Sequence, residues 1–110
     1  MIENQVIKKG AQATIILAEE LVASEVPNLK IVMKRLIGEG VTSIILDCTH
    51  LILMDSTGIG CLVAAHNSLT RVNGSLTIIQ ASADIYDLLC SMRLDRHIKM
   101  TPQFAAKDEK

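Results

Sequence analysis

Three short apolar segments, separated by stretches of helical period, constrain what this chain can fold into. Residues 13–18, 42–47 and 76–79 are rich in isoleucine, leucine and threonine and show little alternation of polar and apolar side chains. Such runs predict buried strands, and for residues 42–47 a central strand covered on both faces of a sheet. Alternation of strands with helices predicts an α/β sheet with parallel crossovers. Gly10 permits a turn after a possible edge strand over residues 5–8, so a hairpin is expected at the start.

The first helix is predicted from Ser24 to about residue 37. Ser24 is the expected N-cap, and Pro27 falls in the first turn, where a missing N–H costs nothing. Gly38 and Gly40 can end the helix with a left-handed cap. The apolar side chains follow the spacing of one helical face, at Val26, Leu29, Val32, Met33, Leu36 and Ile37.

Two further helices follow. The second ends near Val72, because Asn73-Gly74 is a strong stop signal. Ser82 is the expected cap of the third. The predicted apolar face of the second helix comprises Ile59, Leu62, Val63, His66, Leu69 and Val72, and that of the third Ile85, Leu88, Leu89 and Met92. A last short strand is expected over residues 97–101, and residues 105–110 are expected to be frayed.

The length and composition limit the class of protein. A chain of 110 residues suits one domain over residues 1–110, with a core over about 5–101 and a tail over 102–110. Aromatic residues make up 2% and the net charge is −1, which argues against nucleic-acid binding. The apolar runs are too short to cross a bilayer and the first nine residues are polar and charged, so we expect a cytoplasmic protein. The odd cysteine count predicts buried, reduced thiols at Cys48, Cys61 and Cys90.

The segment Asp55-Ser56-Thr57-Gly58-Ile59-Gly60 is the stretch that local folding rules explain least. Asp or Ser before a helix is ordinary capping. Two glycines in the first turns are less ordinary, because each costs about 0.5–1 kcal/mol relative to alanine. Close approach of the helix to the sheet, or of another molecule, would offset that cost. A phosphate on Ser56 would meet the positive end of the helix dipole, so the helix should tolerate it.

In this context the chain resembles the STAS domain of anti-sigma factor antagonists. The resemblance rests on Met54 to Gly60 opening a helix after an apolar strand, on residues 43–47 and 72–76, and on residues 88–95. It implies a mixed sheet of four to five strands with about four helices. It also implies that Ser56 is the phosphoacceptor, flanked at the partner surface by Asp55, Thr57, Gly58, Ile59, Gly60, Val22 and Ser24. The chain departs from the family pattern at Glu19, Val22 and Arg93.

The partners implied by the resemblance are an anti-sigma factor serine kinase of ATPase fold and a cognate phosphatase. The unphosphorylated protein would bind the kinase and so free a sigma factor. It would be a monomer or a weak homodimer, and it would bind neither a membrane nor nucleic acid directly. One alternative is a STAS adaptor subunit of a lipid-transport complex or stress-signalling scaffold, without phosphorylation. Another, less favoured, is a small nucleotide-binding or hydrolytic protein that uses the glycine-flanked helix start as an anion site.

The sequence offers little support for enzyme chemistry. Ser56 and His66 are ten residues apart on one predicted helix, about 15 Å, too far for a nucleophile and its base. His66 on an apolar face is expected to be a partly buried packing residue. His50 and His97 lack metal-ligand spacing. The segment 58–60 lacks the remainder of a phosphate-binding loop. We therefore expect no catalytic residues, no metal and no cofactor.

Overall fold

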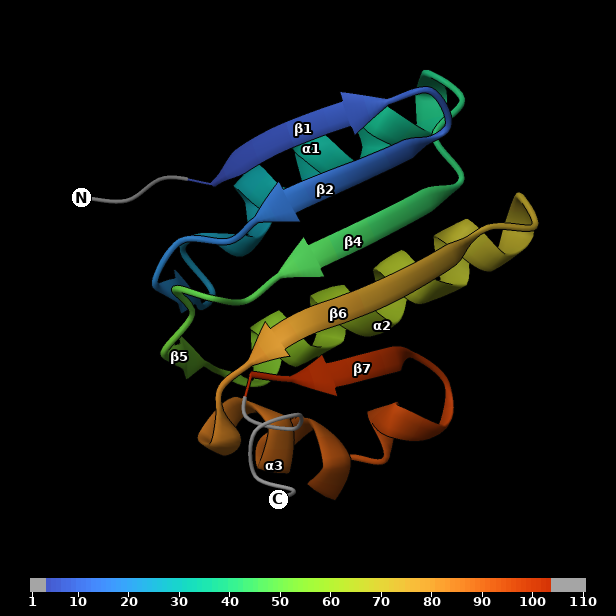
Figure 1. The fold of residues 1–110 in the computed structure, drawn as a ribbon. Helices are drawn as coiled ribbons and strands as arrows, with labels where there is room; N and C mark the ends of the chain where they lie inside the picture. The colour runs from blue at the N-terminus through green and yellow to red at the C-terminus, as the bar shows by residue number, and fades with distance from the viewer. Residues whose placement is uncertain (1–3, 104–110) are drawn as a thin grey trace.

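The computed structural model describes residues 4–103, and Figure 1 shows how their helices and strands are arranged. The elements are β1 (Gln5–Lys9), β2 (Gln12–Ile16), β3 (Glu20–Leu21), α1 (Val26–Gly38), β4 (Ser43–Asp47), β5 (Leu53–Met54), α2 (Ser56–Arg71), β6 (Ser75–Ala81), α3 (Ala83–Ser91), the 3₁₀ helix η1 (Leu94–Arg96) and β7 (Lys99–Pro102). The predicted strands and helices are all present, within a few residues of their expected bounds. Residues 105–110 of the predicted tail lie outside the described residues.

Five strands form a mixed sheet in the order β1-β2-β4-β6-β7. The β1–β2 hairpin is antiparallel and turns at Gly10, whose φ is +60°. The other three pairs of neighbouring strands, β2–β4, β4–β6 and β6–β7, are parallel. This arrangement confirms the predicted α/β class and mixed sheet, with three α-helices and η1 in place of about four helices. β3 and β5 form a second, two-stranded parallel sheet, which the sequence did not predict.

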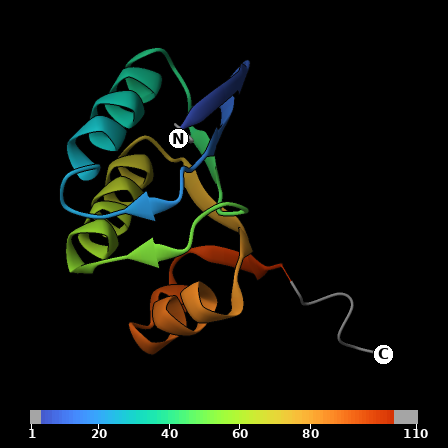
Figure 2. The same cartoon turned by 90° about the vertical axis from the view of Figure 1, so that its left-hand side faces the viewer.

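All three crossovers step in the same direction along the sheet, from β2 to β4, to β6 and to β7. Because such crossovers are almost always right-handed, steps in one direction place the helices on the same side. Figures 1 and 2 show α1 and α2 behind the sheet and α3 next to β7, leaving the opposite face without a helix. The expectation that the central strand is covered on both faces is therefore wrong.

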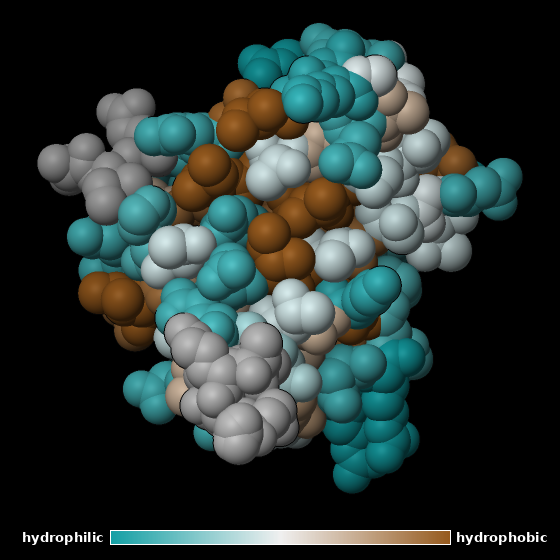
Figure 3. Space-filling model, viewed as in Figure 1, coloured by the Kyte–Doolittle hydropathy of each residue, from teal (hydrophilic) through white to brown (hydrophobic). Residues whose placement is uncertain are grey.

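Burial along β4 and its neighbours alternates accordingly. Ile44 and Leu46 are buried, whereas Ser43, Ile45 and Asp47 on the other face are only partly buried. This alternation is not evident in the sequence, because isoleucines also occupy the open face. The strand registers place Ile45 beside Thr14 and Thr77 there, with further isoleucines at positions 7, 16 and 79. Figure 3 shows apolar residues near the middle of that face.

The core between sheet and helices is aliphatic, as the composition predicts. Its fully buried large side chains are Ile15, Leu17, Leu21, Leu29, Leu36, Ile44, Leu46, Leu51, Leu62, Leu69, Ile78 and Leu89. All three cysteines are free; Cys48 and Cys61 are buried and Cys90 is half-buried. Burial, with a smaller effect of the neighbouring Asp47 charge, raises the pKa of the Cys48 thiol to about 12. This buried thiol is therefore protonated and inert at neutral pH.

Two helices differ from the sequence-based prediction in detail. α1 begins at Val26 with Glu25 as N-cap and no side-chain capping bond. Ser24 lies in the preceding turn, in which the N–H groups of Glu25 and Val26 both donate to the carbonyl of Val22, so its prediction as N-cap is wrong. Ser82 is the N-cap of α3 as predicted, and its hydroxyl accepts from the N–H of Ile85 at 3.3 Å.

The buried face of α2 is rotated from the predicted one. Cys61, Leu62, Ala65 and Leu69 are buried with Gly58. Ile59 and His66 are half-buried, and Val63 and Val72, both predicted to be apolar-face residues, are exposed. Small side chains such as alanine and cysteine carry little weight in a hydrophobic pattern, yet they let α2 approach the sheet and α1 closely. The rotation turns His66 toward the segment before β7. In α3 Ile85 and Leu89 are buried, while Met92, placed on its predicted apolar face, follows the helix and is exposed.

Candidate functional site

The start of α2 is positioned by the two-stranded sheet. β3 and β5 pair in parallel, with Glu20 beside Leu53 and Leu21 beside Met54. β5 leads directly into Asp55, which has extended backbone and is the N-cap of α2. The pairing therefore holds the loop that follows β3, residues 22–25, against the first turn of α2. The predicted flanking residues from two distant segments meet here.

The carboxylate of Asp55 joins these two segments. One oxygen, Oδ1, accepts a hydrogen bond from the N–H of Gly58 at 2.9 Å, as an N-cap does. The other, Oδ2, accepts from the N–H of Ala23 at 3.0 Å. These donors, Gly58 first and then Ala23 and Thr57, hold the pKa of Asp55 below its usual value. Asp55 is thus ionised at neutral pH and fixes the helix start to the loop before α1.

Ser56 and Thr57 occupy the first two positions of α2, and both side chains are exposed. A phosphoryl group on Ser56 would therefore lie in solvent at the positive end of the helix dipole. The approach to this helix is apolar, since Ile52 is 70% and Leu53 49% exposed. Exposed hydroxyls beside exposed large aliphatic side chains form a surface suited to contact with another protein.

The two glycines of the segment differ in their surroundings. Gly58 is buried, and a methyl group on its Cα would overlap the carbonyl oxygen of Leu21 and lie 2.9 Å from the Cγ of Met54. Close approach of α2 to β3 accounts for this glycine. Gly60 is exposed and faces open space, so nothing in the described fold requires it. Ile59, between them, is half-buried and packs against the core.

The remaining predicted flanking residues, Val22 and Ser24, lie in the loop that Asp55 anchors. Val22 is half-buried and Ser24 is exposed. Together with residues 55–60 they make up one end of the molecule, near the carboxyl ends of β3 and β5. The predicted site residues, which sequence reasoning placed in two separate segments, are therefore contiguous in the fold.

Other residues that could carry chemistry are distributed elsewhere. His50 is exposed in the loop after β4. His66 and His97, 31 positions apart in the sequence, lie across a cleft with their ring centroids 6.3 Å apart. No sequence spacing could have indicated this pair, because it depends on how α2 docks beside η1. The charged residues Asp84, Asp87, Arg93, Asp95 and Arg96 are exposed, as expected of a solvated surface.

The structure thus combines a strand, a loop and an Asp-capped helix with a mixed sheet that helices cover on one face only. The sequence model of the STAS domain matches residues 5–106. The chain therefore belongs to the STAS domain family. No helix among residues 4–103 is long and apolar enough to cross a membrane.

Solved structures show the same fold. The anti-sigma factor antagonist SpoIIAA in its unphosphorylated form is 23% identical, with a TM-score of 0.74 over 89% of this chain and 86% of that chain. A putative anti-sigma factor antagonist from Thermotoga maritima is 18% identical, with a TM-score of 0.82 over 88% and 84%. An anion transporter of the murine solute carrier 26 family is 12% identical, with a TM-score of 0.66 over 87% of this chain and 17% of that chain. No curated protein matches.

Proposed function

We propose that this protein is an anti-sigma factor antagonist controlled by phosphorylation of Ser56. In its unphosphorylated form it binds an anti-sigma factor serine kinase and so releases a sigma factor, and a phosphatase resets the switch. It acts in the cytoplasm as a binding protein and not as an enzyme. The observation that carries the proposal is the exposed Ser56 hydroxyl at the start of α2, beside the exposed side chains of Ile52 and Leu53.

The electrostatics of the site support a switch that acts on docking and not on folding. Phosphorylation adds about −1.5 to −2 charges. At the start of α2 these charges meet the positive end of the helix dipole, which offsets their repulsion by Asp55. A partner that covers Ile52 and Leu53 would instead have to bury the new charge, which is costly without matching cations. Phosphorylation should therefore weaken partner binding and leave the fold intact.

The relatives are consistent with this proposal. SpoIIAA has been solved in both unphosphorylated and phosphorylated forms, and the phosphorylated form is 22% identical to this chain. Since the STAS fold also occurs within a much longer transporter, an adaptor role in another complex is the competing function. Co-purification separates the two, because an ATPase-fold kinase supports the switch and a membrane transporter subunit supports the adaptor.

The direct test is phosphorylation by the kinase that co-purifies with the chain. We expect one phosphate per molecule, retained in Thr57→Ala and lost in Ser56→Ala. Ser56→Asp should fold normally and bind the kinase at least tenfold more weakly, about 1.4 kcal/mol. Ser75→Asp is the matched control, because it adds the same charge at an exposed position beyond the other end of α2. Label retained on Ser56→Ala, or equal affinity of both Asp variants, would contradict the proposal.

A further inference from the structure

The charges of this chain are unevenly distributed over its helices. α1 and α2 contain no aspartate or glutamate, although the chain has 12 acidic residues and a net charge of −1. Among residues 4–103 the only ion pair joins Lys8 to Glu39, so the cations of the two helices are not paired with carboxylates. These cations are all exposed, Lys30, Lys34 and Arg35 on α1 and Arg71 on α2. The helix layer therefore presents unpaired positive charge, most of it on α1.

Helix stability does not account for the two lysines of α1. Lys30 and Lys34 are four residues apart and so are neighbours on the helix surface, where like charges destabilise a helix. Lys30 also lies in the amino-terminal half of α1, whose first turn contains no acidic residue, whereas cations are favourable at the opposite end. Only Arg35, in the last turn, complements the helix dipole. The two lysines thus oppose the stability of α1, and a binding role would account for them.

An exposed isoleucine lies among these cations. Ile31 is 63% exposed. Because successive residues of a helix are about 100° apart, Ile31 lies between Lys34 on one side and Arg35 on the other, and Lys30 lies beyond Lys34. This α1 face (Lys30, Ile31, Lys34 and Arg35) has an apolar centre with positive charge on both sides. Protein interfaces are built in this way, with an apolar core and a polar rim. The surface complementary to it is an apolar pocket bordered by carboxylates.

The α1 face is continuous with the start of α2. Figure 2 shows α1 and α2 side by side, with both helices beginning near the ends of β3 and β5. Lys30 lies on the side of α1 next to α2. From there its charge partly offsets the rise that burial causes in the pKa of the Cys61 thiol. Cys61 follows Thr57 by one turn and lies on the same side of α2. The α1 face therefore adjoins the exposed hydroxyls at positions 56 and 57.

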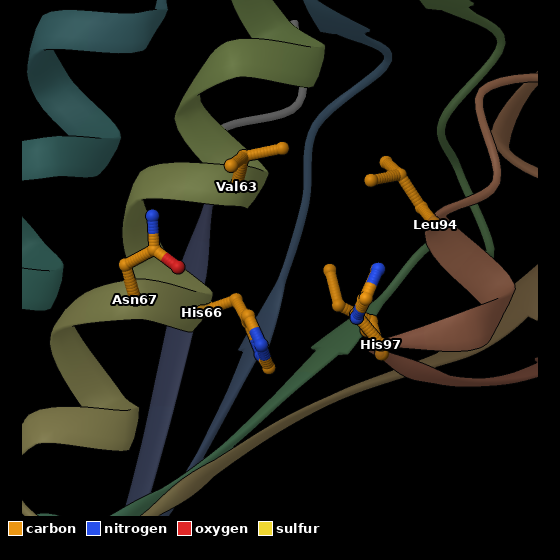
Figure 4. Close-up of a pocket in the computed structure, with 6 residues that line it drawn as sticks. Val63, His66, Asn67, Leu94 and His97 are labelled. Carbon is orange, nitrogen blue, oxygen red and sulfur yellow. The ribbon is translucent and has the colours of Figure 1, made fainter.

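The opposite side of α2 differs from the side next to α1. It faces a cleft lined by Val63, His66, Asn67, Leu94, His97 and Ile98 (Figure 4). None of these six residues is a lysine, arginine, aspartate or glutamate. The positive charge of the helix layer therefore does not extend toward β7, and the charged surface beside the start of α2 is the one on α1.

We propose that the α1 face is a second part of the docking surface, and that it binds an acidic surface of the protein that docks at the start of α2. This inference rests on the proposed function and adds the charge of the partner to it. The partner receives Ile31 in an apolar pocket and places carboxylates opposite the three cations. Because those carboxylates also lie near Ser56, a phosphoryl group there adds like-charge repulsion to the cost of burying it.

The test measures affinity for the protein partner that co-purifies with the full chain, whether or not that partner phosphorylates Ser56. The double variant Lys30→Glu/Lys34→Glu should bind at least tenfold more weakly at about 50 mM salt. Raising the salt to about 300 mM should weaken binding of the wild type and not of the variant, because salt screens the attraction. Lys9→Glu/Lys99→Glu is the matched control, since it makes the same charge change at exposed positions on the open face of the sheet. Its affinity should stay within twofold of wild type.

Two further variants test the parts of the α1 face. Ile31→Ala should weaken binding and leave its salt dependence unchanged, because it removes the apolar centre without changing the charge. Urea unfolding of each variant shows whether it folds. Lys30→Gln/Lys34→Gln, which removes the charges without reversing them, carries the test if the charge-reversed variant does not fold.

Ser56→Asp, measured beside these variants, separates this inference from the switch. If Ser56→Asp binds weakly and the α1 variants bind like wild type, the inference is wrong and the switch stands. If the α1 variants bind weakly and Ser56→Asp does not, the α1 face is supported and control by phosphorylation is contradicted. An equal loss in the Lys9→Glu/Lys99→Glu control would reduce the effect to net charge and overturn the inference.

Vesicles test whether the α1 face binds lipid instead of protein. The full chain should not sediment with phosphatidylcholine vesicles that contain about 30% phosphatidylserine. Sedimentation of the wild type that Lys30→Glu/Lys34→Glu abolishes would assign the α1 face to an anionic membrane surface and overturn the proposal.

Discussion

The carboxylate of Asp55 accepts a hydrogen bond from the backbone N–H of Ala23 at 3.0 Å, across 32 positions of sequence. This bond holds the loop before α1 against the first turn of α2. The same carboxylate caps α2 through the N–H of Gly58. One side chain therefore determines both where α2 begins and which loop lies beside the exposed Ser56.

The two bonds predict a pH-dependent contribution of Asp55 to stability. The pKa of Asp55 is lowered in the folded state, chiefly by the Gly58 N–H and then by that of Ala23. The stabilisation is therefore complete above the unfolded-state pKa of about 4 and is lost as the pH falls through the lowered folded-state value. In urea unfolding, wild type should be more stable than Asp55→Asn at pH 7, and the difference should shrink below pH about 4. A difference that stays constant down to pH 3 would contradict this account.

The glycines at positions 58 and 60 predict opposite effects of the same substitution. Gly58→Ala should lower the free energy of unfolding by about 1–3 kcal/mol, because the new methyl group overlaps the Leu21 carbonyl. Gly60→Ala should raise it by about 0.5–1 kcal/mol, because the methyl group enters open space and alanine favours the helix. Chemical denaturation of the two variants measures both effects. If both destabilise equally, close approach of α2 to β3 is not the reason for Gly58.

The one-sided sheet predicts a difference between two neighbouring isoleucines. Ile44 faces the helices and is fully buried, whereas Ile45 is only partly buried on the open face. Ile44→Ala should lower the free energy of unfolding by about 2–5 kcal/mol through loss of burial and cavity formation. Ile45→Ala should cost about 1–2 kcal/mol, because only part of its surface is removed from water. Equal losses in guanidinium denaturation would indicate that the open face is covered in solution.

Much of the fold can be predicted from local patterns in this sequence. The five strands of the main sheet, the three α-helices, the turn at Gly10 and the cap at Ser82 all follow from period, β-branching and turn chemistry. The helix starts are less predictable, because Ser24 is as good a cap by type as Ser82. Only the bonds from Glu25 and Val26 to the carbonyl of Val22 make Ser24 part of a turn.

The sequence by itself determined the α/β class, the aliphatic core and the segment 55–60 as the candidate site, because these depend on residues close together in the chain. Only the tertiary structure decided which face of the sheet is open, that Gly58 contacts β3, and that Asp55 reaches Ala23. It also brought His66 and His97 together. These relationships arise from crossover direction and helix docking, which bring distant segments into contact and leave no periodic mark in the sequence.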